Sequence, residues 1–589
     1  MVRLIAVTFI FVFSSTFIVE AQEEEKKKKF GIGKNKEKNQ DDDGEKKEKK
    51  MFRLGVGDKI GKLAGKLMTK STDDLSKASA SARYVVDMYT ENASLSSDSF
   101  MPEGWKEGDD MVAINFLNMD GLGMLSIDGE VTYDGKPMEY SSMGVYVAIV
   151  DDNPKPKEIL VKTTSGDRAF FVVEPTAPIK ILSVNGQTDN VKIDLGEDLE
   201  IDIENGEGHE GTLVKVAMLT DVMGARAWNY FAEFRSKDKV IIPEQAFSNL
   251  EISGSVNGVG HLKQGSSYLL IERYVVTETD GQDLASAEIY SHSYSSIPIT
   301  VDGKPDTKNY GDITAKGKYQ AVNGEMQYNA SKPNARFGIP FPQGSKFGLA
   351  SLSVRGTLFH QETNTSESDY GSFKVVTTTT TTQQFPQLPD VFWEQLMENI
   401  YQDVVAFFKE DYGIDFVNVE AVTSSPHYEN FYEADQENTN VHIKKSYKNT
   451  KNLLPSSAGA ILSSISSNTT SDKPTINLMR DSETDGLVSI TVDLQIASNS
   501  DDNIVLVPRM NMSIIGREEK YTNVEGRYCN VQVQAFDGMP FSESEFDDIN
   551  ALNRITRKDE MMSALRHSVS ELRKEEVERG YDKIWALKE

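Results

Sequence analysis

The 589-residue chain contains a single cysteine, Cys529. One cysteine excludes an intrachain disulfide framework, on which many secreted eukaryotic modules depend. It also excludes a lipid anchor on a cysteine directly after an export signal, because Cys529 lies far down the chain. Its neighbours, Tyr528, Asn530 and Val531, are typical of a strand and include no histidine, so we expect a buried structural thiol.

Motifs for metal binding and catalysis are also lacking. The chain has seven histidines, and no two of them stand at the three-to-five-residue spacing with which a helix or turn shares a metal. Ser425 and His427 stand in a predicted loop and keep a hydrolase open as an alternative, although no Gly-x-Ser-x-Gly elbow surrounds Ser425. Asp109 and Asp110 lack the alternating oxygen ligands of a calcium loop. We expect no enzyme activity, no metal and no cofactor.

Long apolar runs are confined to the beginning of the sequence. Arg3 precedes a largely apolar stretch, residues 4–19, and small residues flank Glu20 at a cleavage position after Ala21. The stretch is shorter than the roughly twenty residues that span a bilayer. Residues 1–21 therefore predict a cleaved signal peptide. With no disulfides, export favours the periplasm or outer membrane of a bacterium, and an extracellular location is the alternative.

Charge is unevenly distributed along a chain whose formal net charge is −28. Residues 22–80 begin with a low-complexity charged arm that has too few apolar residues to fold, and a weak basic amphipathic segment follows. Candidate residues for contact with a membrane surface are Arg53, Lys59, Lys62, Lys66 and Lys70; a flexible linker is the alternative. The remaining chain is acidic, which argues against nucleic acid as a partner. The sequence identifies no small-molecule substrate.

Short β-rich runs separated by turn residues occupy the middle of the chain. They predict a β domain over residues 81–188 and an immunoglobulin-like β-sandwich over residues 189–303. Trp228 and Tyr230 in this sandwich are candidates for a sugar platform, but core packing is the commoner role of such aromatic side chains. Residues 304–376 predict a β extension. The six threonines at 377–382 then predict a linker over residues 377–389, or a last extended edge.

The pattern changes to helical spacing at Asp390, which can cap a helix that ends at Gly413. Residues 487–496 and 504–515 predict two long strands joined by a turn, and residues 528–535 predict a third strand. The apolar positions that predict the first and the closing helix are Phe392, Leu396, Ile400 and Val404, and Met561, Leu565, Val569 and Leu572. Residues 390–589 thus form an expected α/β docking domain. The predicted fold class is multidomain α+β, with β-sandwich modules followed by a mixed α/β domain.

This order of elements resembles a family of envelope domains. The family includes the amino-terminal domain of the Tol-system propeller protein, the periplasmic domain of the curli secretion channel and lipoprotein activators of peptidoglycan synthases. Their short turn before a hydrophobic strand corresponds to Asp485-Gly486, ahead of residues 487–494. The resemblance implies a non-enzymatic docking domain that holds envelope proteins. The lipid cysteine of the lipoproteins and the amphipathic membrane strands of the channel are missing here.

We therefore expect an exported envelope protein that acts in protein interaction or envelope assembly, with envelope proteins as its partners. The first alternative is a secreted or surface recognition module that binds a glycan or a host protein. The second alternative is the hydrolase.

Overall fold

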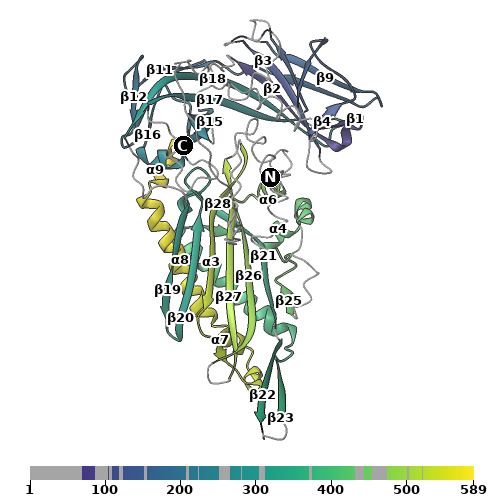
Figure 1. The fold of residues 1–589 in the computed structure, drawn as a ribbon, viewed down its shortest axis with the longest axis vertical. Coiled ribbons are helices and arrows are strands. Elements are labelled where there is room, and N and C mark those ends of the chain that lie inside the picture. Colours follow the sequence, from purple (N-terminus) through teal and green to yellow (C-terminus); the bar gives the residue numbers. More distant parts are fainter. Residues whose placement is uncertain are drawn as a thin grey trace, which may run out of the picture.

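The computed structural model describes residues 69–86, 104, 106, 109–118, 124–142, 144–150, 155–206, 211–222, 225–250, 265–279, 282–303, 312–357, 359–369, 374–431, 443–453, 474–499, 503–519 and 522–589. It is mostly β, with several sheets, and its longer helices lie in the carboxy-terminal part. In Figure 1 the strands of the upper part run across the view, and those of the lower part run along the longest axis. A β-rich multidomain architecture agrees with the sequence-based prediction.

The upper part is built on an eleven-stranded sheet. Its centre is the antiparallel pair β17 (Gly265–Thr279) and β18 (Ser286–Asp302), which are paired along the whole of β17. On one side β17 pairs with β14 (Leu213–Val222), and on the other side β18 pairs in parallel with β2 (Ala78–Val86). The remaining strands are β1 (Thr69–Thr72), β3 (Met111–Asn118), β4 (Met124–Ile127), β7 (Glu139–Ser142), β8 (Val145–Ile149), β12 (Val191–Asp194) and β15 (Ala225–Arg235).

Two smaller sheets complete the upper part. The four-stranded sheet contains β5 (Gly129–Tyr133), β6 (Lys136–Pro137), β9 (Lys157–Thr163) and β10 (Arg168–Val173). The three-stranded sheet contains β11 (Ile179–Val184), β13 (Leu199–Asn205) and β16 (Lys239–Ile242). The longer strands alternate, so one face of each enters a core: on β10, Phe171 is buried while Phe170 is exposed.

The β units predicted at residues 81–188 and 189–303 share their main sheet, whereas the sequence predicts two successive modules. β18 pairs with β2 near its start and with β12 near its end, so a single long strand belongs to both units. The described fold also includes residues of the predicted charged arm. Residues 69–80 include β1 and the 3₁₀ helix η1 (Leu75–Lys77), whose Leu75 is fully buried.

The lower part contains a nine-stranded sheet, in which β21 and β26 are parallel and most other neighbours are antiparallel. Its strands are β19 (Ile313–Ala321), β20 (Gly324–Lys332), β21 (Lys346–Thr357), β24 (Asp415–Phe416), β25 (Ile443–Ser446), β26 (Gly486–Ser498), β27 (Ile504–Glu519), β28 (Thr522–Ala535) and β29 (Met539–Pro540). β19, β20 and β21 come from residues 304–376. The predicted β extension is therefore part of the α/β domain and not a separate unit.

Helices α3 (Asp390–Tyr412) and α8 (Lys558–Glu578) pack against this sheet and against each other, as the apolar spacing predicts. Lys558 on α8 pairs with Asp403 on α3 at 2.5 Å. The Asp390 cap is wrong: Pro389 occupies the cap position, and the Asp390 carboxylate pairs with Lys445 at 2.6 Å. The shorter helices are α4 (Val419–Thr423), α6 (Pro474–Asp481), α7 (Ala551–Ile555), α9 (Tyr581–Trp585), η2 (Glu244–Asn249), η5 (Phe341–Gln343), η6 (Pro426–Asn430), η7 (Glu543–Asp547) and η8 (Ala586–Lys588).

Gly413 ends α3 in the left-handed conformation, with φ of 72°. Its N–H donates to the carbonyl of Lys409 at 3.1 Å. Because an L side chain is strained at this φ, Gly413→Ala should lower the free energy of unfolding by about 1 kcal/mol. Gly413→Asn should cost less, because asparagine tolerates this conformation. Urea unfolding of both variants measures the difference, and an alanine variant as stable as the unmodified chain would contradict the role of the cap.

Candidate functional site

Of the predicted membrane-contact residues, Lys70 alone belongs to the part of the chain that the structure describes. Arg53, Lys59, Lys62 and Lys66 lie outside the described residues. Lys70 lies on β1, where its side chain is exposed and its backbone pairs with Leu125. It is thus part of a folded edge strand, not of an amphipathic helix.

Ser425 and His427 are close in space, but no hydrogen bond between their side chains is among the described contacts. The Ser425 hydroxyl donates to Asp481 at 2.5 Å and accepts the backbone N–H of His427 at 3.2 Å. Ser425 therefore caps η6, which is a local structural role. The hydroxyl proton is directed at a carboxylate and not at the imidazole, so the pair lacks the geometry of nucleophile and base.

Tyr230 is one of the two candidate residues for a sugar platform, and its contacts show its role. Its side chain is buried, and its hydroxyl donates to the carboxylate of Glu272 on β17. Burial raises the pKa of Tyr230 well above its usual value, with the charge of Glu272 acting in the same direction. Trp228 is partly buried against the same small apolar cluster. These contacts are those of core aromatic side chains.

Glu272 is the centre of a polar cluster on β17 and β18. His292 approaches its other carboxylate oxygen with Nδ1 at 2.8 Å and stacks on Tyr294, with ring centres 5.9 Å apart. Burial lowers the pKa of His292 below its usual value, although Glu272 opposes this. Lys215 lies over the ring of Tyr274 at 3.8 Å. Because the carboxylate is hydrogen-bonded by its neighbours, the cluster is suited to holding strands together rather than to accepting a proton.

The last residues of the chain connect the lower part to the upper sheet. Lys588 pairs with the buried Glu233 of β15 at 3.4 Å. Burial would raise the pKa of Glu233, but the charges of Lys588, Lys215 and Arg336 outweigh it and lower the pKa. The contact fixes the position of β15 relative to the carboxy terminus.

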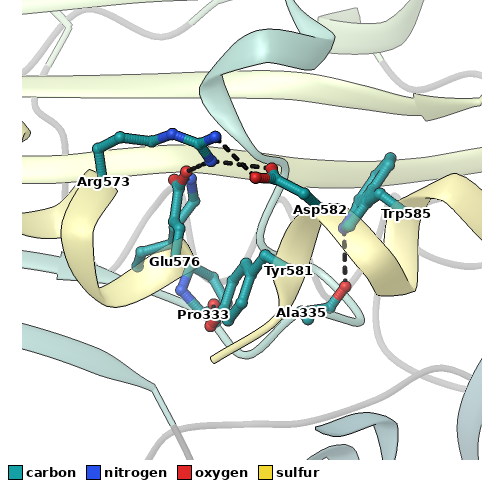
Figure 2. A network of polar contacts seen from close by, with 8 residues as sticks. Pro333, Ala335, Arg573, Glu576, Tyr581, Asp582 and Trp585 are labelled. Atoms are coloured by element: carbon teal, nitrogen blue, oxygen red, sulfur yellow. Dashed lines mark hydrogen bonds and ion pairs between the residues drawn. The ribbon is translucent and has the colours of Figure 1, made fainter. Parts of the chain in front are cut away.

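Figure 2 shows the network that anchors this terminus. Lys332 and Glu576 form a fully buried ion pair, and Arg573 joins Glu576 to Asp582 at 2.8 Å on each side. The other two anchors are direct bonds to the backbone after β20: Tyr581 donates to Pro333 at 2.7 Å, and Trp585 donates to Ala335 at 2.9 Å.

Cys529 is a buried free thiol, as predicted. Burial raises its pKa to about 12, so the reactive thiolate is suppressed at neutral pH.

Asp485, in the turn that carries the family resemblance, also has a structural role. Its carboxylate accepts the backbone N–H groups of Ser345 and Lys346 at 2.9 and 3.0 Å. The Ser345 hydroxyl donates to the same oxygen at 2.5 Å. These bonds hold the starts of the parallel strands β21 and β26 together.

A hairpin with many exposed side chains is formed by β22 (Phe359–Asp369) and β23 (Lys374–Gln384). The two strands pair antiparallel along their full lengths, from Phe359 opposite Gln384 to Asp369 opposite Lys374. Figure 1 shows the hairpin at the lower end of the molecule, opposite the upper sheets. Within the described part of the chain, β23 has β22 as its sole strand partner. Among the described strands, none covers the outer edge of β23, and such an edge is where another strand can pair.

The threonine run lies on this strand. Residues 377–382 are all threonine and belong to β23, so the predicted linker is wrong here, and the alternative of an extended edge is confirmed. Val376 is 60% exposed, and Thr377, Thr378 and Thr379 are exposed. The β-branched side chains favour the extended conformation even where, as at residues 376–379, they are exposed. This β preference is the sequence signal that identifies the hairpin.

Among the described residues, no group of three or more histidine, cysteine, aspartate or glutamate side chains could hold a metal ion. The described helices likewise include none that is long and apolar enough to cross a membrane. The hairpin of β22 and β23, which has an exposed strand edge, is the candidate functional site. Neither a scan against protein-family models nor a search of curated proteins found a match for this chain.

Proposed function

We propose that the chain is an exported bacterial cell-envelope protein, in the periplasm or at the outer membrane, that acts in protein interaction or envelope assembly without catalysis. The observation that carries the proposal is the exposed hairpin of β22 and β23, with the uncharged run of residues 375–384 on β23. An edge of this kind can accept a strand from another protein through main-chain hydrogen bonds. The predicted signal peptide and the lone cysteine support export into a bacterial envelope.

The lower part supports a docking role through its order of elements. The order α3, β24, α4, α6, β26, β27, β28 and α8 supports the resemblance to the envelope domains, with β25 between α4 and α6 and with α7 between β28 and α8. The immunoglobulin-like architecture of residues 189–303 belongs to the same proposal, supported by the apolar core that β11, β13 and β16 share with β14, β17 and β18. It is an architectural statement and implies no ligand.

A photo-crosslinking side chain at Thr379, on the exposed part of β23, tests the proposal in intact bacterial cells. We expect covalent adducts with envelope proteins, identified by mass spectrometry. The control is the same side chain at Glu130, which is exposed on β5 in the upper part. Adducts with glycans alone, or equal protein adducts from Thr379 and Glu130, would contradict a docking role of the hairpin.

Cell fractionation tests the location and the first alternative function. Retention in the periplasm or outer membrane together with co-purifying envelope proteins agrees with the proposal. Release to the medium, with binding of glycans or host proteins, would favour a recognition module instead.

A further inference from the structure

The edge of β23 lacks the protection that the other sheet edges carry. Proteins guard exposed edges with charged residues, prolines or short strands, because an open edge pairs with other chains. Residues 375–384 of β23 contain neither a charge nor a proline. The longest such run on another edge strand of the described sheets is residues 227–232 of β15. An edge that is left unguarded over this length is suited to permanent pairing.

The neighbouring strand of the same hairpin is guarded. β22 carries Glu362, Glu367 and Asp369, whereas the sole charge on β23, Lys374, is at its first position and pairs with Glu367 at 2.6 Å. Two β22 edges brought together would place carboxylates on adjacent strands, where like charges repel. Pairing is therefore directed to β23.

We propose that β23 pairs antiparallel with β23 of a second copy of this chain, which gives a four-stranded sheet in the order β22, β23, β23, β22. The inference rests on the proposed function, because it names the first partner of the same hairpin. A two-fold pairing centred on Thr379 places Thr377 opposite Thr381 and Thr378 opposite Thr380 of the other copy. Threonine pairs across strands are favourable, and the uniform run matches its own sequence in reverse direction.

The acidic charge of the chain does not prevent this pairing. The two β22 strands would be separated by three spacings of about 4.8 Å, or about 14 Å. This distance exceeds the screening length of about 8 Å at physiological ionic strength. The hairpin also lies at one end of the molecule, so the acidic bodies of two copies point away from each other (Figure 1). Salt should strengthen the dimer, because it screens the repulsion that remains.

Light scattering of the purified chain tests the proposal, with Thr379→Lys as the disrupting variant. We expect a particle of twice the monomer mass for the unmodified chain. Thr379→Lys places two lysines opposite each other and should weaken the dimer at least about tenfold. The matched control is Thr365→Lys, which adds the same charge to an exposed threonine of β22. It should leave the dimer intact. Equal circular dichroism of both variants verifies that the fold is retained.

Disulfide trapping gives a second readout of the register. Thr379→Cys, which stands on the two-fold axis, should form a dimer that a reducing agent separates, because directly paired residues lie within disulfide reach. A cysteine at Thr365 should not. A monomeric unmodified chain, or a dimer that is indifferent to Thr379→Lys, overturns the inference. If Thr379 then still crosslinks to a different envelope protein, the proposed function stands; if it crosslinks to no protein, both fail.

Discussion

Replacing Glu576 with alanine should lower the free energy of unfolding by about 3–5 kcal/mol, because a buried charge loses its partner. Lys332 and Glu576 both have fully buried side chains, on β20 and α8. Burial already lowers the pKa of Lys332 well below its usual value. Without the carboxylate, the ammonium group is left beside the ring of Phe341, 4.3 Å away, which compensates for little of the lost pairing. Urea unfolding followed by tryptophan fluorescence measures the loss, and two of the four tryptophans, Trp393 and Trp585, lie in this part of the chain.

Two further variants separate the effect of burial on the free energy of unfolding from the effect of charge. Glu575 is the next residue on α8 and pairs with Arg579 at 3.4 Å, with its side chain 43% exposed. Glu575→Ala should therefore cost only about 0.5 kcal/mol. The double variant Lys332→Met with Glu576→Leu should recover most of the loss, because apolar replacements remove both buried charges. Equal losses for Glu576→Ala and Glu575→Ala would show that the buried pair contributes nothing special.

The elements predicted most accurately are those whose signal is local. Leu396, Ile400 and Val404 recur at helical spacing, and all three are buried on α3. The long strands at residues 486–498 and 504–519 were likewise predicted close to their ends. A helical face or a run of strand-forming residues depends on residues that are neighbours along the chain. The sequence alone is therefore sufficient to predict such elements.

The partners of these elements could not be predicted. β21 pairs with β26, and Lys332 meets Glu576 from a position 244 residues away. Nothing in the local pattern near residue 346 distinguishes a separate β extension from one edge of a sheet that is completed later. The predicted boundary between two β units at residue 188 has the same explanation. The sequence of β18 does not reveal that this strand pairs with both β2 and β12.

The candidate site was missed because its strands do not alternate. Strand prediction relies on one apolar face, whereas residues 365–369 of β22 and 376–379 of β23 are exposed on both faces. A polar, repetitive run such as residues 377–382 is then interpreted as a linker. The intrinsic preference of threonine for strands is a weaker signal than the repetitive composition, but it indicates the correct structure.

Acidification should destabilise the upper sheet through Glu272. Burial alone would raise its pKa, but the hydrogen bond and charge of His292, the charge of Lys215 and the hydroxyl of Tyr230 together lower the pKa from 4.5 to about 2. A carboxylate whose pKa is lowered by folding stabilises the folded state above its unfolded pKa. This stability is lost as the pH falls from about 5 to about 2. The lowered pKa corresponds to about 3 kcal/mol.

His292 acts in the same direction. Burial lowers its pKa below 6.5, more than Glu272 raises it, so the unfolded chain binds the proton more readily. Stability contributed by a neutral histidine is present above its unfolded pKa and falls as the pH drops below about 6.5. The two residues therefore make the upper sheet most stable near neutral pH.

Glu272→Gln should lower the free energy of unfolding by about 3 kcal/mol at pH 7, because the amide cannot match the charged hydrogen bonds. The same variant should lose less stability than the unmodified chain between pH 6 and pH 3, since one titrating group is gone. Urea titrations followed by circular dichroism at each pH measure both effects. Glu130→Gln, on the exposed face of β5, is the control and should keep the acid dependence. If Glu272→Gln shows the same loss on acidification as the unmodified chain, another group causes it, and the polar cluster is not what ties β17 to β18.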